Sequence, residues 1–115
     1  MKFIPLVLVV LAGLLTGCGT PTIYSWGRYE DMVYKTYSEP GKLSPDDQIL
    51  KMNEDLEKAK SRNKPVHPGF YAHLGYLYAQ TGKLDQARQA LEAEKAQFPE
   101  STVFVDHLLA NLERK

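Results

Sequence analysis

Few side chains in this sequence of 115 residues are suited to chemistry. It has a single cysteine, Cys18, and three histidines, His67, His73 and His107. One thiol excludes both an internal disulfide and a metal site built from several thiolates. His73 and His107 lie 34 residues apart and can be neighbours in a repeat, but two imidazoles alone make an incomplete metal site. We therefore expect no metal, no cofactor and no catalytic centre, and predict that the protein is not an enzyme.

The charged residues indicate no nucleic-acid or nucleotide partner. Lys plus Arg and Asp plus Glu number 14 each, so no net field attracts nucleic acid. The acidic pairs Glu30-Asp31 and Asp46-Asp47 are interpreted as a solvated face and a helix first turn, and the basic run over residues 58–64 as a helix end. There is no glycine-rich phosphate loop.

Cys18 follows a segment typical of an export signal. A basic N-terminal end precedes an apolar stretch over residues 3–15, which is shorter than the about 20 residues that span a bilayer. The stretch runs into a motif that resembles the lipobox of bacterial lipoproteins: Leu15, Thr16, Gly17 and Cys18. The resemblance implies a cleaved signal peptide over 1–17 and acylation of the Cys18 thiol. The alternative is an ordinary secretory signal followed by an incidental cysteine.

Acylation would anchor the mature chain to a membrane, because lipoproteins carry two or three acyl chains and one alone binds only marginally. The residue after the cysteine is Gly19, where retention at the inner membrane typically requires Asp. The lipoprotein resemblance therefore implies the outer membrane, on its periplasmic face. Residues 18–23 are interpreted as a lipidated tether.

Helical periodicity dominates the rest of the chain and predicts an all-α fold of antiparallel helix pairs. An aromatic face over 24–37 predicts the first helix. Ser44, followed by Pro45, predicts the N-cap of a second helix. A third helix over 69–80 and a fourth over 84–97 follow, and Ser101 is expected to cap a fifth. The aromatic face of the first helix is formed by Trp26, Tyr29, Val33 and Tyr37. The buried face of the second helix is formed by Ile49, Met52, Leu56 and Ala59.

The third and fourth helices resemble one unit of the 34-residue TPR repeat. The resemblance implies that residues 66–115 form a TPR-like repeat with a capping helix, and that 24–65 form a divergent helical pair. It departs from the pattern at Glu94, where alanine is usual, which indicates either looser packing or a neighbour that tolerates a carboxylate. The alternative is an unrelated bundle of five helices. The residues at the pattern's structural offsets are Tyr71, Leu74, Gly75, Tyr78, Ala87, Leu91 and Pro99.

The TPR resemblance also implies a concave binding groove along the first helices of successive pairs. Five residues are its candidate partner-binding residues: Ala72, Tyr76, Ala79, Gln80 and Asp106. The Lys, Arg and Asn that clamp a peptide carboxylate in some TPR domains are absent from these positions, so the expected groove is shallow, aromatic and nearly uncharged. The alternative is that Tyr76 packs on the preceding helix.

The mature chain resembles a family of small, uncharacterised proteobacterial lipoproteins with a Tyr-Ser-Trp-Gly-x-Tyr-Glu opening and a Glu-Lys-Ala-x-x-Pro-Glu-Ser close, here residues 24–30 and 94–101. Members tend to be encoded beside other lipoproteins, one of them similar to curli-type secretion components. The resemblance implies an envelope location and a helical fold. We expect an adaptor that binds an envelope protein, such as another lipoprotein encoded beside it. The alternative is an accessory regulator of a periplasmic enzyme or secretion assembly.

Overall fold

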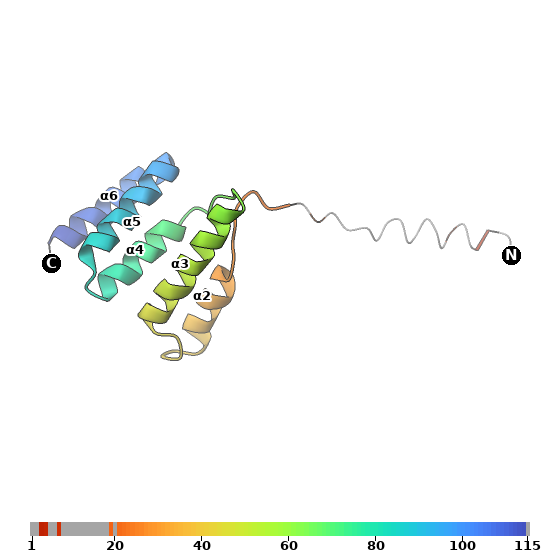
Figure 1. Ribbon diagram of the computed structural model, residues 1–115, viewed down its shortest axis with the longest axis horizontal. Helices are drawn as coiled ribbons and strands as arrows, with labels where there is room; N and C mark the ends of the chain where they lie inside the picture. The colour runs from red at the N-terminus through yellow and green to blue at the C-terminus, as the bar shows by residue number, and fades with distance from the viewer. Residues whose placement is uncertain (1–2, 5–6, 8–18, 20, 115) are drawn as a thin grey trace.

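The computed structural model describes residues 3–4, 7, 19 and 21–114 (Figure 1). The four lipobox residues and most of the predicted signal peptide lie outside the described residues. Within residues 21–114 all regular structure is helical, and this confirms the all-α class; Ser25 and Val66 form an isolated bridge. The elements are α2 (Tyr29–Ser38), α3 (Pro45–Ser61), α4 (Phe70–Gln80), α5 (Leu84–Gln97), the 3-10 turn η1 (Pro99–Ser101) and α6 (Thr102–Glu113).

Local signals define the start of α3 as the sequence predicts. The Ser44 hydroxyl accepts the Asp47 N–H at 3.1 Å, which satisfies one of the free donors of the first turn. Pro45 occupies the first helical position, where its missing N–H costs nothing. The observed bounds of α5, Leu84–Gln97, are those predicted for the fourth helix.

One predicted helix start is wrong, and one predicted side-chain cap does not form. The first helix begins at Tyr29, so Trp26 precedes it, because the Ser25 N–H donates to the Pro65 carbonyl at 2.7 Å and Gly27 then turns the chain with a φ of 50°. The last helix begins directly after Ser101, as predicted, but the Ser101 side chain accepts no capping hydrogen bond. Its hydroxyl instead donates to the Phe98 carbonyl at 2.6 Å within the turn η1.

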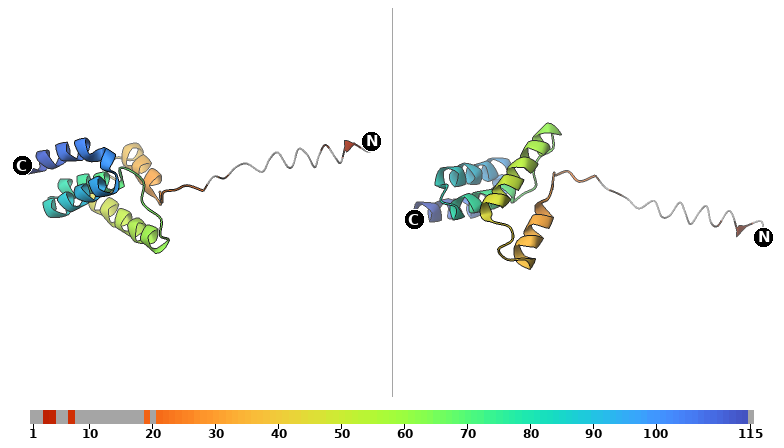
Figure 2. Two further views of the ribbon diagram at one scale, coloured as in Figure 1. Left: turned by 90° about the horizontal axis from the view of Figure 1, so that it is seen from above. Right: turned by 60° about the horizontal axis from the view of Figure 1, so that its bottom comes forward.

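The helices pack in chain order, α3 on α4, α4 on α5 and α5 on α6, and successive helices run in opposite directions (Figure 1). Figure 2 shows the same arrangement from two further sides. The main core lies between α2, α3 and α4, with one residue each from α5 and from the loop before α4. It is built from Met32, Ile49, Met52, Ala59, Val66, Phe70, Leu74, Leu77 and Ala90.

The backbones of α4 and α5 approach closely at a glycine. A Cβ on Gly75 would stand 2.9 Å from Leu91 Cγ and 3.1 Å from the Ala87 carbonyl oxygen, and Ala87 itself is fully buried. A side chain at residue 75 would therefore require the Leu91 side chain and the Ala87 backbone to shift. None of the described helices is both long and apolar enough for a membrane span.

Candidate functional site

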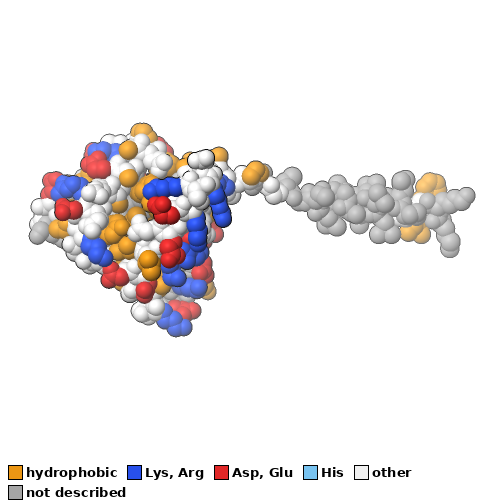
Figure 3. All heavy atoms as spheres, in the orientation of Figure 1, with side chains coloured by type: hydrophobic (Ala, Val, Ile, Leu, Met, Phe, Trp, Pro, Cys, Tyr) orange, Lys and Arg blue, Asp and Glu red, His pale blue; other side chains and the backbone are white. Residues whose placement is uncertain are grey.

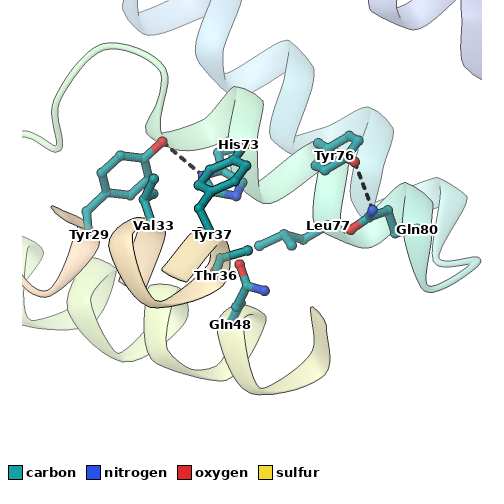
Figure 4. A pocket seen from close by; sticks show the side chains of 9 residues that line it. All are labelled: Tyr29, Val33, Thr36, Tyr37, Gln48, His73, Tyr76, Leu77 and Gln80. Atoms are coloured by element: carbon teal, nitrogen blue, oxygen red, sulfur yellow. Dashed lines mark hydrogen bonds between the residues drawn. The ribbon is translucent and has the colours of Figure 1, made fainter. Parts of the chain in front are cut away.

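An open groove of about 420 Å³ lies between α2 and α4, with one residue of α3 at its base. Figure 4 shows the side chains of the two helices facing each other across it. We call it the aromatic groove. Its lining residues are Tyr29, Val33, Thr36, Tyr37, Gln48, His73, Tyr76, Leu77 and Gln80.

Buried contacts on both helices fix the groove's width. Met32 of α2 and Leu77 of α4 are each 2% exposed and belong to the same core cluster. At one end of the groove the Tyr29 hydroxyl and His73 Nδ1 form a hydrogen bond of 2.9 Å across the two helices (Figure 4). The groove is therefore held by the core beneath it and by a polar contact at one end.

The groove carries no formal charge. No Asp, Glu, Lys or Arg is among the described residues that line it. Burial, followed by the neighbouring His67, lowers the pKa of His73, so its imidazole is neutral at pH 7. Burial also raises the pKa of the Tyr29 phenol, which stays protonated. Hydroxyl, amide and imidazole groups are left as the polar contacts for a ligand.

Two tyrosines at the groove expose large aromatic surfaces. Tyr37 of α2 is 81% exposed and Tyr76 of α4 is 57% exposed. The Tyr76 hydroxyl accepts a hydrogen bond of 2.8 Å from Gln80 Nε2, one helical turn further on (Figure 4). Exposed aromatic rings beside a concave, uncharged surface suit the burial of a partner's apolar or aromatic side chain.

The structure brings three of the five candidate partner-binding residues to hollows. Tyr76 and Gln80 line the aromatic groove. Tyr76 also joins Ala79 in a smaller hollow of about 140 Å³ between α4 and α6. Ala72 and Asp106 line neither hollow: the Ala72 N–H donates to Glu94, and Asp106 accepts from Lys95 Nζ at 2.7 Å. Tyr76 thus lies on the surface between the two hollows and not in the core.

The side of the groove formed by α2 was missed by the sequence prediction. Val33, Thr36 and Tyr37 line that side. On the α4 side, His73 lines the groove and was missed as well. The periodic aromatic face over 24–37 was a usable sign that α2 presents such side chains. Periodicity within one helix does not show which other helix lies opposite.

The three histidines occupy different settings. His67 is buried, with Trp26 stacked on its ring at a centroid distance of 4.1 Å, and its Nε2 has no hydrogen-bond partner among the described residues. His73 contacts Tyr29 in the groove, whereas His107 is exposed on α6. No three His, Cys, Asp or Glu side chains group as a metal site within the described part of the chain.

The opening motif over residues 24–30 attaches the N-terminal segment to the helices. The Arg28 N–H and guanidinium Nε donate to the Asp55 carboxylate at 2.8 and 3.0 Å, and Asp55 is 9% exposed. A Cβ on Gly27 would lie 2.6 Å from an Asp55 oxygen, so the close approach requires glycine there. The contacts of this motif are therefore mainly structural. Tyr29 is the one residue of the motif that lines the aromatic groove.

Fold and groove together define a class of protein: a small all-α protein of antiparallel helices with an open, uncharged aromatic groove between two of them. A family model described as "Domain of unknown function (DUF4810)" matches residues 23–108. The chain belongs to this family, and the matched region contains every residue of the aromatic groove. No curated protein and no solved structure matches the chain.

Proposed function

We propose that this protein is a proteobacterial envelope lipoprotein whose helices form a TPR-like adaptor module, and that it binds a segment of a protein partner in the aromatic groove. The observation that carries the proposal is the groove itself: it is concave, lacks charged lining residues and presents Tyr37 and Tyr76 to solvent. Tyrosines of this kind are common anchors of protein interfaces. The lining offers no activated nucleophile, which favours binding over catalysis.

Two features support the TPR-like part of the proposal. The small residues at the repeat offsets, Gly75 and Ala87, lie at a close approach of α4 and α5. The two hollows lie between α2 and α4 and between α4 and α6. If the chain is divided into TPR-like repeats, these three are the first helices of successive pairs. In TPR arrays the first helices line the concave ligand-binding face.

The anchor part of the proposal depends on the lipobox ending in Cys18 and on Gly19 after it. In this proposal the protein is held at the periplasmic face of the outer membrane, and its partner is another envelope protein, such as a lipoprotein encoded beside it. Radiolabelled palmitate should enter the wild-type protein but not a Cys18→Ser variant, which should also retain its leader. Labelling of that variant would contradict the anchor.

Site-specific photocrosslinking in cells tests the groove. A photoreactive phenylalanine analogue at residue 37 should capture a partner, because Tyr37 lines the groove. The matched control is residue 34 on the same helix, since Tyr34 is 71% exposed but does not line the groove. The same partner captured equally from both residues would mean that α2 is contacted outside the groove. A captured enzyme or secretion component whose activity changes in the presence of this protein would favour the regulator alternative.

A further inference from the structure

A cluster of basic side chains lies where the N-terminal segment meets the helices. Four basic residues end α3 and begin the loop after it: Lys58, Lys60, Arg62 and Lys64. The Lys64 ammonium donates to the Thr22 hydroxyl at 3.2 Å, which places this cluster directly beside the N-terminal segment. Figure 3 shows Lys and Arg side chains gathered on that side of the body. We call these four residues the basic end of α3.

Positive charge is in surplus at this end and balanced at the opposite one. Within the described part of the chain, Lys60 pairs with Glu57 at 3.0 Å, whereas Lys58, Arg62 and Lys64 form no ion pair. Around the start of α3, three lysines are each paired with a carboxylate: Lys35 with Asp31, Lys42 with Glu39 and Lys83 with Asp46. A chain with no net charge is thus positive at one end.

The sequence distance to the proposed lipid anchor is short. Thr22 lies four positions after Cys18, and four residue steps span at most about 14 Å however the chain is arranged. The potential of an anionic bilayer decays over a Debye length of about 8–10 Å, so an anchor at Cys18 brings the basic end of α3 within or close to its range. Trp26 is 39% exposed on the same segment, and tryptophan is enriched at the headgroup level of membranes. Ile23 beside it is 78% exposed and adds apolar surface.

We propose that the basic end of α3 binds the anionic phospholipid headgroups of the membrane that holds the protein. The inference rests on the proposed acylation of Cys18, which supplies the membrane, and adds a second, electrostatic contact to it. The contact holds the body against the bilayer instead of leaving it to swing on its tether. The aromatic groove then faces its partner in a restricted range of orientations.

Trp26 provides a probe, because it is the only tryptophan in the chain and lies partly exposed beside the tether. The acylated protein is reconstituted in vesicles with brominated acyl chains, made either of phosphatidylcholine alone or with about 30% phosphatidylglycerol. Quenching of Trp26 fluorescence should be stronger in the anionic vesicles. About 0.5 M salt should remove the difference, because the Debye length then shortens to a few ångströms.

Charge-neutralising variants identify the surface. The double variant Lys58→Gln with Arg62→Gln should weaken the contact between the anchored body and the anionic surface at least about five-fold, and so reduce the extra quenching of Trp26. This is the effect expected for one basic residue near a charged membrane. This pair leaves the Lys64–Thr22 contact intact. The matched control, Lys35→Gln with Lys42→Gln, removes the same charge at the opposite end and should leave quenching unchanged.

The outcomes separate this inference from the proposed anchor. Palmitate labelling with equal quenching in both vesicles, or equal effects of the two double variants, would overturn the lipid contact and leave the anchor standing. A protein that takes up no palmitate would overturn the anchor and this inference with it. Salt-sensitive quenching that depends on Lys58 and Arg62 would support both.

Discussion

The carboxylate of Glu94, in α5, accepts the backbone N–H of Gly69, at the start of α4, at 2.7 Å. The same side chain accepts the N–H groups of Tyr71 and Ala72 at 3.1 and 3.3 Å, and it is 2% exposed. A helix start has unpaired N–H donors and a positive dipole end, and Glu94 supplies the acceptor and the negative charge for both. The residue that departs from the repeat pattern is therefore the cap of a neighbouring helix.

Replacement of Glu94 should destabilise the protein strongly. Glu94→Ala leaves three N–H groups at a buried helix start without an acceptor, and we expect a loss of about 2–4 kcal/mol in the free energy of unfolding. Glu94→Gln keeps one acceptor oxygen and should lose less. Urea denaturation followed by circular dichroism measures both, with exposed Glu92→Ala as the control. Equal midpoints for the Glu94 and Glu92 variants would contradict the capping role.

The Asp55–Arg28 pair allows a comparison between two adjacent carboxylates. Asp55 is 9% exposed and accepts both the main chain and the guanidinium of Arg28, whereas the Glu54 side chain, which also pairs with Arg28, is 49% exposed. We expect Asp55→Asn to cost about 1–3 kcal/mol, because the side chain loses its charge and one of its two buried acceptor oxygens, and Glu54→Gln to cost less than about 1 kcal/mol. Thermal melts of both variants test the difference. A larger loss for Glu54→Gln would show that the exposed pair dominates.

Ala87 should not tolerate a large side chain. It is fully buried where α5 meets α4, beside Gly75, and overpacking a filled core costs about 1–3 kcal/mol or more. Ala87→Phe should lower the melting temperature by several degrees, about 4–8 °C per kcal/mol for a domain of this size. Ala96→Phe is the control, since Ala96 is exposed on the same helix. An unchanged melt for Ala87→Phe would contradict the close helix contact.

The sequence predicted those parts of the fold that depend on local signals. Helix periodicity and the cap at Ser44 lie within a few residues of the elements they define, and the start of α3 was predicted correctly for this reason. The extended course at Ser25 depends on a hydrogen bond to Pro65, which is distant in the sequence, so the prediction of a helix there was wrong. The same limit applies to the candidate site. The TPR resemblance pointed to Tyr76 and Gln80, but Tyr37 joins them only through the packing of α2 against α4.

The lowered pKa of His73 makes stability depend on pH. The unfolded chain binds a proton at His73 near pH 6.5, whereas the folded chain does so only at lower pH, because burial and His67 disfavour the charged imidazole. The unfolded state therefore holds more protons below pH 6.5. The contribution of neutral His73 to the free energy of unfolding is complete above pH 6.5. It is lost as the pH falls from 6.5 through the pKa of His73 in the folded state.

Urea denaturation between pH 5 and 8, covering the range about the reference pKa of histidine, measures this dependence. His73→Gln should flatten the fall in stability below pH 6.5. His107→Gln should leave it unchanged, because His107 is exposed on α6. A pH profile that His73→Gln does not alter would assign the dependence to other groups.

Tyr76 should contribute to partner binding and little to stability. It is 57% exposed, it lines both hollows, and its hydroxyl contacts only the exposed amide of Gln80 among the described residues. Truncation to alanine removes aromatic area that a partner would bury, so Tyr76→Ala should weaken binding by about 1–2 kcal/mol, or roughly 5–30-fold in Kd. The melting temperature should stay within about one or two degrees of wild type.

The matched control is Tyr34→Ala, which removes an equally large exposed ring outside the groove. Binding of the captured partner to each variant can be measured by titration calorimetry, alongside a thermal melt of the same sample. Weaker binding by Tyr76→Ala with an unchanged melt, and normal binding by Tyr34→Ala, is the expected result. If Tyr76→Ala melts at a much lower temperature but binds normally while folded, the ring stabilises α4 and the partner contacts another surface.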